Sequence, residues 1–274
     1  MIAFIHIKKT AGNSIKYLLR SHFGAAHCDV KPWEKEHKVY SAAHLKQLMR
    51  VYPWLQSIAG HMIAPHSDLR DQVSDLKYYT FLREPIRRCV SEYQYYVLRG
   101  RYRPNTFDSW ILDPRYRNVQ VQALAGKEDL DVAIERLEND VAFTGLIERF
   151  NESLALMGPM LDLPNLVPRA SQRNTAESNE IRDSLLADPE VLKTLHKANE
   201  LDIELYRHAR DVVYPRQLER MGIDPAKTTP PAEASWPAYN VRYASYKLYH
   251  HAVYKPALYG RRYAARSSLP IIGR

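Results

Sequence analysis

Cysteine and long apolar runs are both scarce in this sequence, and each scarcity excludes a class of protein. The only two cysteines, Cys28 and Cys89, are too few for a disulfide framework, so a reducing compartment is expected. No run of about 18 apolar residues is present, so no transmembrane helix is predicted. The opening MIAFIHIKK lacks the charged start, long apolar stretch and cleavage site of a signal peptide. These features predict a cytoplasmic protein.

Sequence motifs for metals and for common nucleotide sites are also missing. There is no HExxH pattern or CxxC pair, and the four-residue separation of His61 and His66 is not enough to indicate zinc. No metal site is therefore predicted. The Walker A pattern GxxxxGK[ST] is absent as well, which argues against an ordinary P-loop kinase.

The positive charge of the chain is concentrated at its C-terminal end. The 274 residues have a net charge of +8, but Ala232 to Arg274 contains seven Lys or Arg residues against one Glu. The rest of the chain is therefore nearly neutral. A charge that is not spread over a folded face is a poor footprint for nucleic acid, so no nucleic-acid partner is expected. Prolines in 224–237 indicate a linker, which predicts a domain over 1–226 and a linker with a basic tail over 227–274.

Strands and helices alternate along the main body. Short apolar or aromatic runs predict strands at Met1–Ile7, Lys77–Leu82 and Val141–Leu146. Helical spacing follows them, and a long helix is expected from about Ala176 to Tyr206. This alternation predicts an α/β fold with a central parallel sheet flanked by helices. The remaining predicted helices are Ile15–Leu19, Ile86–Leu98, Val119–Leu124, Leu130–Leu137 and Asn151–Leu161.

The segment KKTAGNS lies between the first strand and the first helix. A turn there directs backbone N–H groups at one point, and the helix dipole adds positive potential. Gly12 allows close approach of the backbone, Lys9 brings a mobile charge, and Asn13 and Ser14 bring short donors. The segment is thus a candidate phosphate or sulfate site. The alternative is an N-cap serine beside a surface lysine.

A second candidate segment, LREPIRRCVSEYQYY, follows the strand at Lys77–Leu82. Arg83 ends that strand and Ser91 lies eight residues later on the next helix. Ligands of open α/β sheets collect beyond the carboxyl ends of strands, where the first segment also lies. Arg87 and Arg88 are interpreted as solvated helix charges.

Together these segments resemble PAPS-dependent sulfotransferases. FIHIKKTAGNSI is similar to their 5′-phosphosulfate loop, usually near HIPKTAGTS, and FLREPIRRCVSEYQYY is similar to their 3′-phosphate motif. Asn118-VQVQALAG and TGLIERFNESLALM resemble the glycan O-sulfotransferase branch, which includes heparan sulfate 2-O- and 6-O-sulfotransferases. The resemblance spans about Ile2 to Tyr206 and implies a P-loop-kinase-like fold. The implied PAPS-binding residues are Lys9, Thr10, Ala11, Gly12, Asn13, Ser14, Arg83 and Ser91.

The resemblance also implies a reaction, in-line transfer of a sulfuryl group from PAPS to a hydroxyl of a glycan or glycolipid. Lys9 would stabilise the leaving phosphate oxygen, and His61, in SIAGHMIAPH, is the expected base because it resembles the base-bearing motif of that branch. His66 is the reserve candidate. The expected enzyme is bacterial and releases PAP. Rival hypotheses are a nucleotide-binding protein of the same fold without catalysis, and a small-molecule kinase.

Two positions depart from the family pattern. Lys8 replaces the usual proline, and we expect it to face solvent, although it could instead add charge near the anion. Asn13 replaces the usual threonine but keeps a donor. Glu148 could orient the base or the acceptor, or could be a carboxylate at a helix start. Asn174 has a position but no assigned role, and we expect Asp202, Leu205 and Tyr206 to be structural.

Tyrosines are the other feature of the tail. Seven of the 19 lie there, and Tyr239, Tyr243, Tyr246 and Tyr249 recur at the spacing of one helix face. Such a face can cover apolar surface of the domain itself, pack against another protomer, grip an acidic glycan, or lie on an anionic membrane surface. Peripheral membrane contact is therefore a further expectation.

Overall fold

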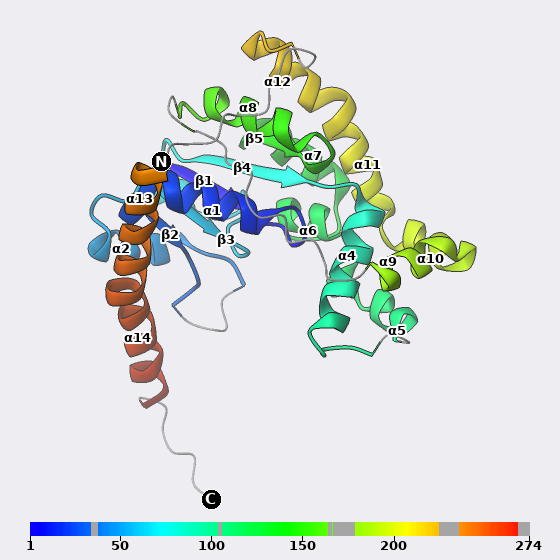
Figure 1. Cartoon of the computed structure of the whole chain (residues 1–274), viewed down its shortest axis with the longest axis horizontal. Coiled ribbons are helices and arrows are strands. Elements are labelled where there is room, and N and C mark those ends of the chain that lie inside the picture. Colours follow the sequence, from blue (N-terminus) through cyan, green and yellow to red (C-terminus); the bar gives the residue numbers. More distant parts are fainter. Residues whose placement is uncertain (34–37, 104–105, 164–165, 167–178, 225–235, 268–274) are drawn as a thin grey trace, which may run out of the picture.

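The computed structural model describes residues 1–33, 38–103, 106–163, 166, 179–224 and 236–267. At its centre is a sheet of five parallel strands in the order β2-β3-β1-β4-β5 (Figure 1). The strands are β1 (Ile2–Ile5), β2 (His27–Asp29), β3 (Ser57–Gly60), β4 (Lys77–Leu82) and β5 (Val141–Leu146). The predicted α/β architecture with a central parallel sheet is confirmed.

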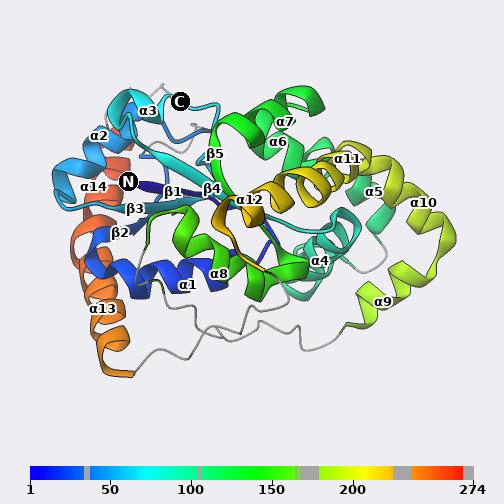
Figure 2. The ribbon, with the colours of Figure 1, turned by 90° about the horizontal axis from the view of Figure 1, so that it is seen from above.

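Helices cover both faces of this sheet, which makes three layers (Figure 2). On one face lie α1 (Gly12–Phe23) and α8 (Phe150–Met160), and α2, α3, α6 and α7 lie on the other. Helices α4, α5, α9 and α10 gather at the end of the molecule away from β2. The bounds of the remaining helices of the main body are α2 Ala42–Val51, α3 Leu69–Gln72, α4 Pro85–Leu98, α5 Phe107–Leu112, α6 Val119–Ala125, α7 Leu130–Asn139, α9 Glu180–Ala187, α10 Pro189–Ala198, α11 Glu200–His208 and α12 Tyr214–Met221.

The predicted strands are all present, and the sheet contains two further strands that were not predicted. β1 is shorter than the predicted Met1–Ile7, while the bounds of β4 and β5 agree with the prediction. The missed strands β2 (HCD) and β3 (SIAG) are three and four residues long and carry no run of β-branched residues. Their strand state depends on pairing with neighbours in the sheet rather than on local propensity.

The prediction of one long helix up to Tyr206 is wrong. In the part of that segment that the structure describes, the chain forms α9, α10 and α11. Pro189 opens α10 because its ring cannot continue the preceding helix, and the Asp188 carboxylate accepts from the N–H groups of Glu190 and Val191. Asn199 then separates α10 from α11.

The tail forms a rod of two helices beside the edge strand β2 (Figure 1). α13 (Trp236–Tyr249) and α14 (Lys255–Ser267) are joined by a π-helical segment, His250–Tyr254. α13 therefore begins inside the predicted linker 224–237, of which 225–235 lie outside the described residues. Tyr246 is 5% exposed against the domain, so this face of the tail covers the surface of the domain itself.

Candidate functional site

The candidate residues converge at the carboxyl edge of the sheet because of the strand order. β1 lies between β3 and β4, so the loop after β1 is flanked by the residues that follow those two strands. His61 follows β3 on one side, and Arg83 follows β4 on the other. The two sequence segments and the candidate base, far apart in the chain, therefore meet at one edge.

The loop after β1 is tightly wound and held from within. Lys9 and Ala11 have φ values of 65° and 55°, a left-handed conformation that side chains usually avoid. The Thr10 side chain is fully buried and its hydroxyl donates to the Ile7 carbonyl oxygen at 3.0 Å. Thr10 thus uses its hydroxyl to shape the loop from inside.

Gly12 begins α1 at the point where the loop passes His6. A Cβ at Gly12 would lie 1.7 Å from Nε2 of His6, so only glycine fits beside that imidazole. Among the described residues, no side chain caps the N-terminus of α1, and Asn13 is exposed there. An anion at this helix start would meet backbone N–H groups beside the half-buried Ser14, whose own N–H donates to the Ala11 carbonyl at 2.9 Å.

Lys9 and Arg83 supply positive charge beside this helix start. Nη1 of Arg83 donates to the Lys9 carbonyl oxygen at 3.1 Å, which ties the two segments together. Burial lowers the pKa of Lys9, and the nearby Arg83 charge lowers it further. Burial also lowers the pKa of Arg83. Two crowded cations favour a bound anion that would relieve their repulsion.

Tyr95 is a member of the site that the sequence analysis missed. Its ring lies 4.6 Å from Nζ of Lys9 and 5.4 Å from the guanidinium of Arg99. Tyr95 follows Ser91 by four residues on α4, so the two share a helix face, and Ser91 is half-buried there. The four-residue spacing from Ser91 could have identified Tyr95 as a site residue from the sequence.

Arg83 is held through its backbone by Gln120 of α6. The Gln120 side chain accepts from the Arg83 N–H at 2.9 Å and donates to the Arg83 carbonyl at 2.9 Å. Gln120 is fully buried, so this pair of bonds cannot be replaced by water. These two bonds, called the clamp below, fix the backbone of Arg83 and so the direction in which its side chain points from the end of β4.

The clamp in turn depends on a reciprocal cap between α6 and α11. Oδ1 of Asn118 accepts from the N–H groups of Leu201 and Asp202 at 3.1 and 3.3 Å. The Asp202 carboxylate accepts from the N–H groups of Gln120 and Val121 at 3.1 and 2.8 Å. The N–H groups at the start of each helix are thus capped by a side chain from the start of the other helix. The expectation that Asp202 is structural agrees with these contacts.

The interpretation of Arg88 as a solvated charge is wrong, and that of Lys8 needs refinement. Arg88 is fully buried and donates to Glu92 at 2.6 Å, whereas Arg87 is exposed. Lys8 is exposed, but its Nζ donates to the Tyr96 hydroxyl at 3.1 Å and lies 3.4 Å from Glu92. Because Arg88 sits on the inward face of α4, its charge had to be paired there.

The backbone carbonyl of His6 fixes His61 in one tautomer. Nδ1 of His61 lies 2.6 Å from the His6 carbonyl oxygen, which only accepts, so Nδ1 carries the proton and Nε2 keeps a lone pair. The two imidazoles stack with centroids 3.9 Å apart. Burial lowers the pKa of His61 below its ordinary 6.5, and burial with the His61 charge lowers the pKa of His6 to about 2. A neutral His61 with a free Nε2 is suited to accept a proton.

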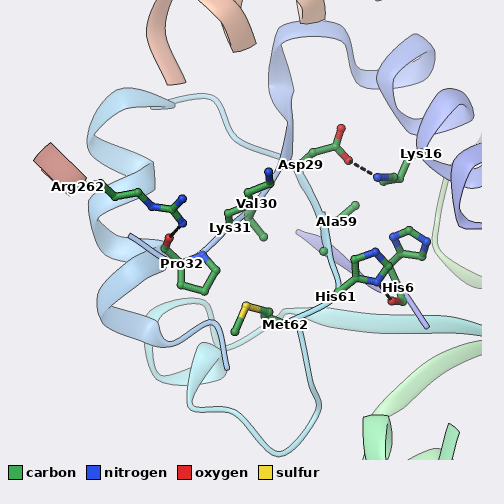
Figure 3. Close-up of a pocket in the computed structure, with 11 residues that line it drawn as sticks. His6, Lys16, Asp29, Val30, Lys31, Pro32, Ala59, His61, Met62 and Arg262 are labelled. Carbon is green, nitrogen blue, oxygen red and sulfur yellow. Dashed lines mark hydrogen bonds and ion pairs between the residues drawn. The ribbon is translucent and has the colours of Figure 1, made fainter. Parts of the chain in front are cut away.

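His61 and His6 also line a cavity of about 340 Å³ (Figure 3). The cavity lies beyond the carboxyl ends of β1, β2 and β3, on the opposite side of the loop from Arg83. Cations from three segments border it: Lys16 from α1, Lys31 after β2, and Arg262 from α14. A hydroxyl-bearing molecule in this cavity would meet His61 on one side and the segment Asp29–Pro32 on the other.

Two other predicted residues are not part of the cavity lining. Nδ1 of His66 lies 3.1 Å from the Leu124 carbonyl oxygen, and His66 is not part of the cavity lining. Glu148 accepts from the Glu84 N–H at 3.0 Å and from the Tyr206 hydroxyl at 2.7 Å, so it joins β5, α4 and α11 rather than His61. Asn174 lies outside the described residues.

Two kinds of feature are absent from the described residues. Within them, no group of three or more His, Cys, Asp and Glu side chains is arranged to hold a metal ion. No helix in the same part of the chain is long and apolar enough to cross a membrane.

Comparison with known proteins supplies the family. No curated protein matches the chain. The model of the sulfotransferase family matches residues 1–209, well over half of the 274 residues. The match includes the loop after β1, His61, Arg83, Ser91 and the reciprocal cap, and ends before α13. The chain belongs to the sulfotransferase family.

Proposed function

We propose that this protein transfers a sulfuryl group from PAPS to a hydroxyl of a carbohydrate or glycoconjugate, with His61 as the base. The observation that carries the proposal is the convergence of a tautomer-fixed imidazole and two crowded cations at one sheet edge. The resemblance to the glycan O-sulfotransferase branch supports the carbohydrate class. The proposed setting is cytoplasmic.

The residues of the loop fit an anionic donor. The uncapped start of α1 offers backbone N–H groups, and Lys9 adds a cation within reach of Tyr95. PAPS supplies the activated sulfuryl group and leaves as PAP. Arg83 and Ser91 lie on the β4 side of the loop, where a forked guanidinium suits the 3′-phosphate.

On the β3 side, His61 would take the proton of an acceptor hydroxyl. The lone pair of Nε2 is free in the tautomer that the His6 carbonyl selects, and the lowered pKa keeps the ring neutral near pH 7. As negative charge develops on the leaving phosphate oxygen, Lys9 and the N–H groups of α1 would stabilise it electrostatically. Proton acceptance by His61 and charge stabilisation by Lys9 thus act on opposite sides of the reacting sulfur.

The test is transfer from labelled PAPS to a panel of glycans, glycolipids and small phenols. His61→Asn should lower turnover about 10²–10⁴-fold while leaving PAP affinity unchanged. His66→Asn is the matched control, because His66 contacts Leu124 away from the cavity, and it should retain activity.

Each rival predicts a different result. Transfer only to phenols or steroids would refute the carbohydrate class, and full turnover by His61→Asn would refute the base. A nucleotide-binding protein would bind PAP without any transfer. A small-molecule kinase would transfer phosphate and lose activity in EDTA, whereas we expect turnover to be insensitive to EDTA.

A further inference from the structure

The rod formed by α13 and α14 holds one wall of the cavity. This wall segment, Asp29–Pro32, leaves β2 and borders the cavity on the side opposite His61 (Figure 3). Three of its four residues are bound by a different residue of the rod: Asp29 by Tyr246, Lys31 by Tyr254 and Pro32 by Arg262. The wall segment therefore takes its conformation from helices that lie more than 200 positions later in the chain.

At Asp29, the rod completes a set of contacts to one carboxylate. The Tyr246 hydroxyl donates to Oδ2 of Asp29 at 2.6 Å, beside Arg20, whose Nε donates to the same oxygen at 2.7 Å. Lys16 lies 3.9 Å from the other oxygen. Burial opposes ionisation of Asp29, but His27, Arg20 and Lys16 outweigh it and hold the pKa of Asp29 well below its ordinary value, so the carboxylate stays ionised.

At Lys31, the rod binds the backbone itself. The Tyr254 hydroxyl accepts from the Lys31 N–H at 2.8 Å and lies 3.3 Å from the Lys31 carbonyl oxygen. Tyr254 is 1% exposed, so its hydroxyl is fixed in place. The backbone of Lys31 is thus paired with a side chain of the rod instead of with another strand.

Arg262 both holds the wall and faces the cavity. Its Nη2 donates to the Pro32 carbonyl at 2.7 Å and its Nε donates to the Trp33 carbonyl at 3.1 Å. Arg262 is itself among the residues that line the cavity. An arginine has five N–H donors, so these two bonds leave donors that can meet a molecule bound there.

We propose that α13 and α14 form part of the acceptor site, with Tyr246 and Tyr254 as positioning residues of the wall segment and Arg262 as a specificity-determining residue. The inference rests on the proposed function. It extends the site beyond the family match, which ends at residue 209, to helices outside that match. Acceptor choice is then set partly by the C-terminal rod, while donor binding depends on the loop after β1.

Variants of the rod separate acceptor binding from donor binding. Arg262→Ala and Tyr254→Phe should each weaken glycan binding about tenfold, the loss expected for one or two hydrogen bonds, and leave PAP affinity within about twofold. Tyr254→Phe removes only a hydroxyl and should fold normally. Lys247→Ala is the charge-matched control, because Lys247 is exposed on the same rod and contacts Tyr243 rather than the wall segment.

A binding titration, acceptor kinetics and hydrogen exchange give the readout. The best glycan of the panel is titrated into PAP-saturated enzyme, and kinetics should show a raised acceptor KM with kcat changed less. Hydrogen exchange in the peptide 29–33 should quicken in Tyr254→Phe, while a peptide covering β4 stays unchanged.

The outcomes distinguish this inference from the proposed function. Wild-type protein that binds glycan without sulfating it refutes the proposed function, yet the rod variants still test the inference by binding. Wild-type glycan affinity in Arg262→Ala and Tyr254→Phe overturns the inference, as does an equal loss of glycan and PAP affinity. No glycan binding by any variant overturns both.

Discussion

Replacing Gly12 by alanine should disturb the centre of the site through one contact. A Cβ at that position would lie 1.7, 2.0 and 2.6 Å from Nε2, Cδ2 and Cε1 of His6, whereas real contacts are rarely closer than 3.0 Å. The His6 ring cannot easily retreat, because it is 8% exposed and already stacks on Phe4 and His61. Overpacking of this kind costs about 1–3 kcal/mol.

The assay is urea unfolding together with PAP titration of the wild type, Gly12→Ala, His6→Ala and the double variant. Gly12→Ala should lower the free energy of unfolding by about 1–3 kcal/mol and weaken PAP binding, since α1 starts at this residue. In the His6→Ala background the clashing ring is gone, so the same substitution should cost much less. A coupling of about 0.5–3 kcal/mol is expected for residues in direct contact.

Gly260→Ala is the matched control. A Cβ at Gly260, in α14, meets nothing within 4 Å, so the substitution should leave stability unchanged or raise it by up to about 1 kcal/mol. Equal costs of Gly12→Ala with and without the His6 ring would refute the reasoning, because the clash would then not be the cause.

Three further outcomes follow from the site. Because the pKa of His61 is lowered, its ring is still neutral at pH 6.5. As the pH is lowered, kcat/KM should therefore begin to fall only below pH 6.5. A decrease of kcat/KM that begins above pH 6.5 would contradict the assignment of His61 as the base. Tyr95→Leu should weaken PAP binding by removing the ring beside the Lys9 ammonium, and Tyr95→Phe should restore it; equal effects of the two variants would exclude the cation–π contact. Asp202→Ala should lower the free energy of unfolding by about 2 kcal/mol or more, measured in urea, because two buried N–H groups lose their acceptor. The control is Asp131→Ala, an exposed carboxylate in the first turn of α7, which should cost about 1 kcal/mol or less.

The sequence predicted the parts of the fold that are encoded locally. β4 and β5 are rich in apolar and aromatic residues, and α4 begins at Pro85, one residue before the predicted start at Ile86. β2 and β3 were missed because their short, mixed sequences form strands only through their neighbours in the sheet. Pro189, by contrast, was a readable stop signal within the predicted long helix, and it was overlooked.

The resemblance of short motifs identified individual candidate residues of the site. Which of these residues lie near one another depends on the fold. Lys9, His61 and Arg83 lie at one edge of the sheet because β1 lies between β3 and β4, an order that no local pattern contains. The roles of these residues toward PAPS stay predictions. The buried pairing of Arg88 with Glu92 follows helical spacing, but which face of α4 turns inward depends on tertiary packing.

The reciprocal cap between α6 and α11 has a consequence for protein synthesis. Neither helix start has its cap until both segments are present, and Gln120 and Asp202 are 82 positions apart. At about 5–20 residues per second, a ribosome needs roughly 4–16 s to make that stretch. During this interval Gln120 cannot be locked in place beside Arg83. A chain that stopped before residue 199 would contain Lys9, His61 and Arg83. It would lack Asp202, however, and therefore the cap that holds Gln120 against the backbone of Arg83.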